Sequence, residues 1–188
     1  MKKWLPVLIF VGVILVIGLW TVGVYNSLVS LQEGAKTAWA QVQNQYQRRA
    51  DLIPNLVETV KGFASQERNV LEEVTRLRSQ WGEARQSGSV EKQVQAARGM
   101  DTALSRLLLV VERYPELKSN QNFLALQDQL EGSENRISVE RRRFNESVLE
   151  YNRRLLTFPG RLFMGFGFER MPLFEAERGA EKPPAVKF

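Results

Sequence analysis

Four charged side chains occupy positions where the helical pattern calls for apolar residues. Beyond residue 26, apolar side chains recur every three or four positions, the spacing of one face of a helix. Arg49, Glu67, Glu134 and Arg141 fall on these faces. An unpaired buried charge is strongly destabilising, so such residues pair with one another or the face opens to water there. We predict that the four residues form one buried polar layer, which sets helix register and the choice of partner helix rather than holding a ligand.

The sequence contains no histidine and no cysteine. This composition excludes Ser-His-Asp and Cys-His catalysis, zinc sites built from Cys and His, and the Glu-x-x-His di-iron motif of helical bundles. Gly165-Phe-Gly167 stands outside any βαβ pattern and does not indicate phosphate binding. We therefore expect no catalytic activity, no cofactor and no metal. An enzyme that works with carboxylates alone stays open as an alternative.

The apolar spacing predicts an all-α domain of four helical stretches. The first starts near Leu28, and the others cover the ranges Leu56–Ala84, Val90–Val111 and Phe123–Phe158. Ser87-Gly-Ser89 separates the second stretch from the third, and Ser89 is a suitable N-cap for a helix that starts at Val90.

Pro54 leaves two topologies open. A proline inside a helix costs about 3 kcal/mol, which favours a turn near Asp51–Pro54. Against a turn, the apolar phase continues from Arg49 into the second stretch. A single helix from Leu28 to Gln86 would be about 90 Å long, too long for the remaining stretches to cover. We predict an antiparallel four-helix up-down bundle, with a three-helix bundle whose first helix is kinked at Pro54 as the alternative.

Residues 4–25 are predicted to be a transmembrane anchor. No charged residue occurs from Trp4 to Gln32, and a bilayer core requires about 20 apolar residues of helix. The run also exceeds the apolar region of a cleavable signal peptide, which has about 7–15 residues. The sequence therefore indicates an uncleaved, single-pass anchor that contacts the lipid bilayer directly.

The charges that flank the anchor predict its orientation. Lys2 and Lys3 precede it, whereas only Lys36 is basic in the 20 or so residues that follow. This bias places the N-terminus in the cytoplasm and the bundle outside it, at the bacterial inner membrane. The glycines of the anchor are not spaced by four, so the anchor does not signal dimerisation and any self-association would involve the bundle.

The chain divides into five predicted segments. They are a basic flank (1–3), the anchor (4–25), the helical bundle (26–158), a Phe/Gly-rich strap (159–175) and a disordered tail (176–188). The strap carries Phe163, Phe166, Phe168 and Phe174. Either it covers bundle residues, or its aromatic rings lie at the membrane interface.

Basic clusters such as Arg141-Arg142-Arg143 do not indicate a nucleic-acid site. Three consecutive residues fan over about 200° of a helix, so they cannot form one stripe. Glu140 and Glu146 dilute the charge further. We interpret these clusters as solvated helix faces and expect no nucleic-acid partner.

Several short strings along the chain are distinctive. They are Tyr25-Asn-Ser-Leu-Val29, the run QYQRRADLIPNLVE at residues 45–58, Asn122-Phe-Leu-Ala-Leu-Gln127, Ser133-Glu-Asn-Arg-Ile137 and the ending from Gly167-Phe168 to Phe174-Glu175. Together these strings resemble the LemA family. The match runs in order from the exit of the anchor to Glu175. The resemblance implies a bacterial membrane protein with an N-terminal helix and a helical bundle, and it implies no enzymatic activity.

These observations support three hypotheses about function. The first is a membrane-anchored adaptor or scaffold of the cell envelope that binds an unidentified membrane or envelope protein. The second is a protein that shapes membranes or contacts lipid through its Phe-rich segment. The third is the carboxylate-based enzyme.

Overall fold

The computed structural model describes residues 4–174, with the backbone alone for residues 5–7. Its helices are α1 (Leu5–Phe63), α2 (Arg68–Gln86), α3 (Val90–Val111), α4 (Pro115–Lys118) and α5 (Gln121–Leu156), followed by the short 3-10 helix Gly160–Phe163. No strand occurs in this part of the chain, which confirms the all-α prediction. The predicted basic flank 1–3 and the tail 176–188 lie outside the described residues.

The described residues form two compact units, to which α1 and α5 both contribute. The anchor unit comprises residues 4–38 and 143–173, and the bundle unit comprises residues 39–142 and Phe174. The predicted domain boundary at residue 26 coincides with no helix end, because α1 continues without interruption to Phe63.

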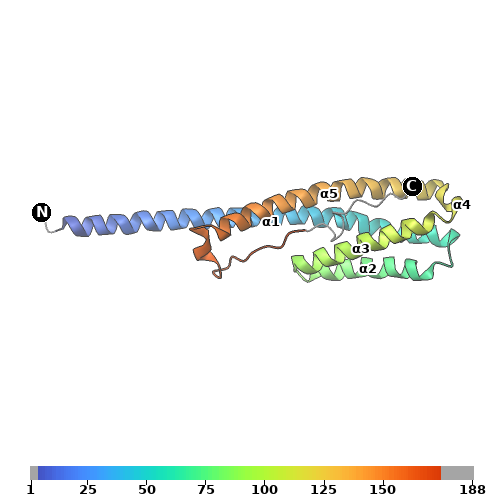
Figure 1. Cartoon of the computed structure of the whole chain (residues 1–188), viewed down its shortest axis with the longest axis horizontal. Coiled ribbons are helices and arrows are strands. Elements are labelled where there is room, and N and C mark those ends of the chain that lie inside the picture. The colour runs from blue at the N-terminus through green and yellow to red at the C-terminus, as the bar shows by residue number, and fades with distance from the viewer. Residues whose placement is uncertain (1–3, 175–188) are drawn as a thin grey trace, which may run out of the picture. The chain divides into compact units, whose positions relative to one another are not determined.

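The bundle unit contains four antiparallel helical segments. Arg78 and Arg85 of α2 contact Ala50 and Gln47 of α1, so the two helices run in opposite directions. Helix α3 lies beside α2 (Figure 1) and runs antiparallel to it. Helix α5 runs antiparallel to α1. The core is built from the apolar faces of all four, including Tyr46, Ile53, Leu56, Val74, Trp81, Ala97, Leu107, Phe123 and Ile137.

Local sequence signals explain several helix ends. The Ser89 hydroxyl accepts a hydrogen bond from the Lys92 backbone N–H, as predicted for the N-cap of α3. Gly88 between the two helices has a φ of +68°, a conformation that favours glycine. At the start of α5, the Asn120 side chain accepts hydrogen bonds from the backbone N–H groups of Asn122 and Phe123.

The predicted turn near Pro54 is wrong, because α1 passes through this proline and ends at Phe63. Proline has no N–H, so the carbonyl of Ala50, four residues earlier, loses its helical donor. Arg78 of α2 replaces it: the Arg78 Nε donates to the Ala50 carbonyl oxygen over 3.0 Å. The chain turns instead at residues 64–67, so the kinked helix to Gln86 is wrong as well.

The anchor unit has a small core where α1 and α5 meet. It consists of Val24, Leu28, Tyr151, Leu155 and Phe168. Burial raises the pKa of the Tyr151 hydroxyl, which donates a 2.9 Å hydrogen bond to the Glu169 carbonyl.

N-terminal to this core, α1 is apolar and exposed. Its most apolar stretch has a mean hydropathy of 2.5 and is 6% buried, which makes this the one helix among the described residues that is long and apolar enough to cross a membrane. The Thr21 hydroxyl donates to the Ile17 carbonyl within the same helix, so it needs no other partner in a bilayer. This N-terminal helix is compatible with single-pass anchoring.

The role of Arg78 can be tested with Pro54. Arg78→Met should lower the free energy of unfolding by about 1–3 kcal/mol, because the buried Ala50 carbonyl is left without a donor. In a Pro54→Ala background the backbone N–H of residue 54 can donate to the Ala50 carbonyl. The same Arg78→Met change should then lower the free energy of unfolding much less. Thermal and denaturant unfolding of the four proteins, followed by circular dichroism, gives the coupling energy. Independent, additive effects would contradict this explanation of the unbroken helix.

Candidate functional site

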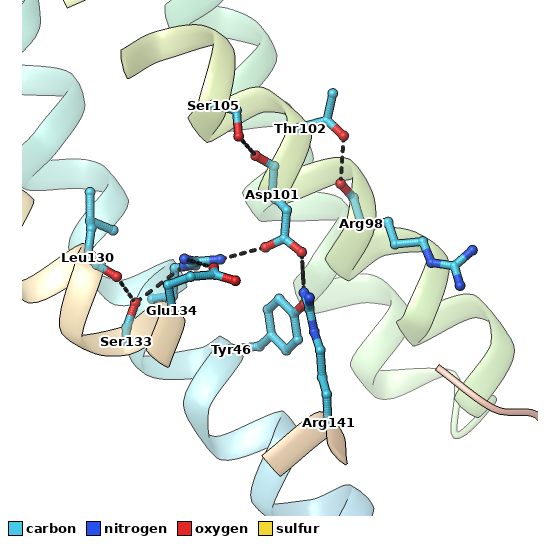
Figure 2. A network of polar contacts seen from close by, with 10 residues as sticks. Tyr46, Arg98, Asp101, Thr102, Ser105, Leu130, Ser133, Glu134 and Arg141 are labelled. Carbon is cyan, nitrogen blue, oxygen red and sulfur yellow. Dashed lines mark hydrogen bonds and ion pairs between the residues drawn. The ribbon is translucent and has the colours of Figure 1, made fainter. Parts of the chain in front are cut away.

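A network of charged and hydroxyl groups joins three helices of the bundle unit (Figure 2). Helix α1 supplies Tyr46 and Arg49, α3 supplies Asp101, and α5 supplies Ser133, Glu134 and Arg141. These side chains meet because each lies on the inward face of its helix. On α3, for example, Asp101 stands between the buried residues Ala97 and Leu104 at steps of four and three.

Arg49 is the buried centre of this network. Its Nη1 lies 2.6 Å from Asp101 Oδ1, its Nη2 pairs with Glu134, and its Nε donates to the Ser133 hydroxyl over 3.3 Å. Only 7% of the Arg49 side chain is exposed, against 48% for Glu134. The network is therefore buried at Arg49 and opens to solvent at Glu134.

Asp101 connects Arg49 to the second arginine. Its Oδ2 accepts a 2.9 Å hydrogen bond from the Tyr46 hydroxyl and pairs with Arg141. The Arg141 guanidinium also donates to the Tyr46 oxygen and lies over the Tyr46 ring, 5.3 Å from its centroid. Two arginines and two carboxylates balance in charge, which offsets the cost of taking them out of water.

Glu67 lies elsewhere, so the predicted four-residue layer needs a correction. Since α1 ends at Phe63, Glu67 sits in the turn before α2. Its carboxylate accepts hydrogen bonds from Arg113 Nη2 at 2.9 Å and from the Tyr114 hydroxyl at 3.2 Å. Loss of hydration raises the pKa of Tyr114, and the bond to Glu67 raises it further. Glu67 thus joins α2 to the end of α3.

Arg49, Glu134 and Arg141 do come together, with partners that the sequence interpretation overlooked. Asp101 takes the place that was assigned to Glu67. Its position on the apolar face of the third stretch, seven residues before Leu108, was a usable signal. Ser133 carried a similar signal, because it lies between Leu130 and Ile137 at steps of three and four.

Phe174 packs against the same network from an extended segment. It is 6% exposed, and its ring stacks on Tyr46 at an interplanar angle of 14° with 6.4 Å between centroids. The Trp39 ring is also near, with 6.4 Å between the two ring centroids. The guanidinium carbons of Arg141 and Arg98 are 4.3 and 5.5 Å from the ring centroid. We call this place, formed by Trp39, Tyr46, Arg98 and Arg141, the aromatic slot.

The four phenylalanines predicted for the membrane interface have different surroundings. Phe174 is in the aromatic slot of the bundle unit, and Phe168 is 3% exposed in the core of the anchor unit. Phe163 is half-buried against that core, and Phe166 is 78% exposed. The strap therefore covers helices through some rings and presents others to the outside.

An open pocket of about 490 Å³ adjoins the aromatic slot. Charged groups of the network line one part of it, and Leu104, Leu108 and Leu130 line another. Among residues 4–174 no group of three or more His, Cys, Asp or Glu side chains is placed to hold a metal ion. The combination of apolar wall, guanidinium groups and aromatic slot suits a polypeptide segment better than a small ion.

Sequence comparison agrees with this architecture. The model of the LemA family matches residues 38–188, which include the whole polar network. The chain belongs to the LemA family. Among its relatives, magnetosome protein MamQ of Magnetospirillum gryphiswaldense is 26% identical over 183 residues, an alignment that covers 85% of this chain and 67% of MamQ. Protein LemA of Metamycoplasma hominis is 23% identical over 159 residues, covering 84% and 71% of the two chains.

This LemA-family protein should depend on Arg49 for stability. Arg49→Met keeps the length of the side chain but removes the cation paired with Glu134 and one of the two arginines paired with Asp101. We expect the free energy of unfolding to fall by about 3 kcal/mol, as for other broken buried pairs. The matched control is Arg106→Met, which removes the more exposed Arg106–Glu73 pair and should cost less than about 1 kcal/mol. Equal losses in thermal and denaturant unfolding would show that burial of Arg49 adds nothing.

Proposed function

We propose that this LemA-family protein is a membrane-anchored adaptor whose bundle unit binds an extended segment of a protein partner. The observation that carries the proposal is Phe174 in the aromatic slot. A residue of an extended segment, far from α1, α3 and α5 in sequence, places its ring between side chains of all three helices. The slot is thus suited to aromatic side chains that arrive on non-helical chain.

The chemistry of the slot defines the class of partner. Each guanidinium over a ring contributes about 0.5–1 kcal/mol at a partly exposed site, and ring stacking contributes a similar amount. We infer that the partner presents a Phe or Tyr in an extended segment, which displaces Phe174 and extends into the adjoining pocket.

Anchoring by residues 4–25 places such an adaptor at a membrane. The exposed apolar stretch of α1 and the relationship to other LemA-family proteins support a membrane-associated role. The lysines at positions 2 and 3 favour a cytoplasmic N-terminus at the bacterial inner membrane, with the bundle unit and its partner outside the cytoplasm.

A non-catalytic role agrees with how the carboxylates of the site are used. Asp101 is paired with two arginines and a tyrosine hydroxyl, and Glu134 is paired with Arg49. These contacts join α1, α3 and α5, so the carboxylates serve to hold the helices that form the slot.

Peptide recognition by the aromatic slot can be tested by removing the Phe174 ring that occupies it. The probe is a synthetic peptide with the sequence of residues 171–178, MPLFEAER. The full-length Phe174→Ala protein in nanodiscs should bind it, because the slot is vacated, whereas the parent protein should bind it at least tenfold more weakly. A peptide with alanine in place of its phenylalanine is the matched control. If neither protein binds the peptide, or if both peptides bind equally, the slot is no recognition site.

Crosslinking in native membranes tests the adaptor role itself. A photo-crosslinking amino acid at Thr102, which lines the pocket, should yield one defined protein adduct, and the adduct should increase in the Phe174→Ala background. The control position is Ser79, an exposed residue of α2 that does not line the pocket. The same adduct from both positions, or none from Thr102 in either background, would count against the adaptor.

A further inference from the structure

The anchor unit exposes a group of large apolar side chains at the end of α5 and directly after it. Phe158 is 74% exposed, Leu162 62% and Phe166 78%, and Leu156 and Met164 are also exposed. We call these five residues the apolar collar. Arg153, Arg161 and Arg170 are exposed on the same stretch of chain. Large rings that face outward together with arginines are typical of segments at a membrane interface.

The collar belongs to a firmly packed segment. The Tyr25 ring meets the Phe168 ring edge-on at 5.4 Å and the Phe163 ring at 6.2 Å. The Asn152 side chain donates to the Met171 carbonyl over 2.8 Å and accepts from the Met171 N–H over 3.0 Å.

Gly160 adds a close backbone approach to this packing. A Cβ at this position would lie only 2.0 Å from the Arg154 carbonyl oxygen, so only glycine lets the chain turn back here against α5. The inner face of the segment is thus used for packing, which leaves the collar facing outward.

The collar lies beside the part of α1 that leaves the membrane. The Phe158 ring is 6.3 Å from the ring of Trp20, which lies within the predicted anchor. At about 1.5 Å per residue, the charge-free run Trp4–Gln32 is about 43 Å long, which equals the thickness of a bilayer including both headgroup regions, about 40–45 Å. The hydrocarbon core takes up only about 20 of these residues, which leaves about four or five at each end, so the residues from about Leu28 to Gln32 fall at headgroup depth.

We propose that the apolar collar inserts into the lipid at the boundary between headgroups and acyl chains, in the leaflet where the anchor ends. Lipid is the occupant because the collar is continuous with the anchor through the Trp20–Phe158 contact. A ring next to a transmembrane helix at this depth meets acyl chains before it meets another protein. Arg161 and Arg170 then lie at the level of the lipid phosphates, where anionic headgroups attract their positive charges. The membrane contact of the protein is therefore a helix together with a folded segment returning from α5.

The absence of cysteine makes the proposal directly testable. Leu162→Cys and Phe166→Cys each give one labelling site on the full-length protein, for an NBD fluorophore whose emission reports polarity. The control is Thr37→Cys, an exposed position on α1 about 25 Å along the helix from Trp20. The proteins are placed in nanodiscs of phosphatidylcholine and phosphatidylglycerol, with or without lipids that carry a doxyl quencher near the headgroup. Circular dichroism and the melting temperature verify that each labelled protein retains the parent fold.

We expect blue-shifted emission and several-fold stronger doxyl quenching at positions 162 and 166 than at position 37. Iodide in solution should quench position 37 several-fold more than the collar positions. If iodide quenches all three alike and the doxyl lipids quench none of them, the collar lies in water and the proposal is wrong. Protection of 162 and 166 from both quenchers would mean that protein, a partner or a second copy, covers the collar, and this also overturns it. Neither result depends on the aromatic slot.

Discussion

The hydrogen bond from Arg78 to the Ala50 carbonyl is the contact on which the course of the chain depends, because it lets α1 continue past Pro54. A helix broken at Pro54 would direct Leu56 and Val60 away from the face that carries Tyr46 and Ile53. In the unbroken helix all of these residues are buried along one side. The same helix provides residues 5–38 of the anchor unit, so one continuous element contributes both the apolar stretch and the first helix of the bundle unit. A single side-chain donor from α2 thus replaces the helical hydrogen bond that Pro54 removes from this element.

Charge pairing in the bundle unit follows from this course. With α1 unbroken, Arg49 lies opposite Asp101 of α3 and Glu134 of α5, and Tyr46 lies one turn away beneath Arg141. A buried arginine specifies neighbours more strictly than an apolar residue does, since only helices that bring carboxylates to it avoid a large desolvation cost. The network therefore favours the register in which the three helices bring these charges together. The aromatic slot is a consequence of that register, because Arg141 is held by Asp101 with its guanidinium 4.3 Å from the centre of the Phe174 ring.

Sequence patterns were sufficient for the helices and insufficient for the turn between the first two. Apolar spacing predicted the all-α fold, the charge-free run predicted the apolar N-terminal helix, and the serine before Val90 predicted the N-cap, since each signal involves residues close together in sequence. The turn at residues 64–67 contains neither glycine nor proline, and the apolar phase runs through it at the same steps of three and four. At Pro54 the local cost favoured a break, whereas the compensating donor lies 24 positions later in sequence. A local sequence pattern cannot reveal a compensating donor that lies so far along the chain. Because the turn was predicted at the wrong place, Glu67 was also predicted to have the wrong partners.

The phenylalanines of the strap show the same limit at the level of single side chains. Phe163, Phe166, Phe168 and Phe174 are identical in type and close in sequence, yet their surroundings range from the anchor-unit core to full exposure and to the aromatic slot. Two features separate them: Tyr25 and Asn152 hold the inner face of the segment, and the arginines of the bundle unit receive Phe174. Neither feature is encoded in the strap itself. A membrane role and a packing role were alternatives for the strap as a whole, but the structure assigns packing to Phe168 and Phe174 and leaves Phe166 free for an outside contact. Whether a strap phenylalanine packs or stays exposed is therefore decided by its own position relative to these partners, and not by the composition of the strap.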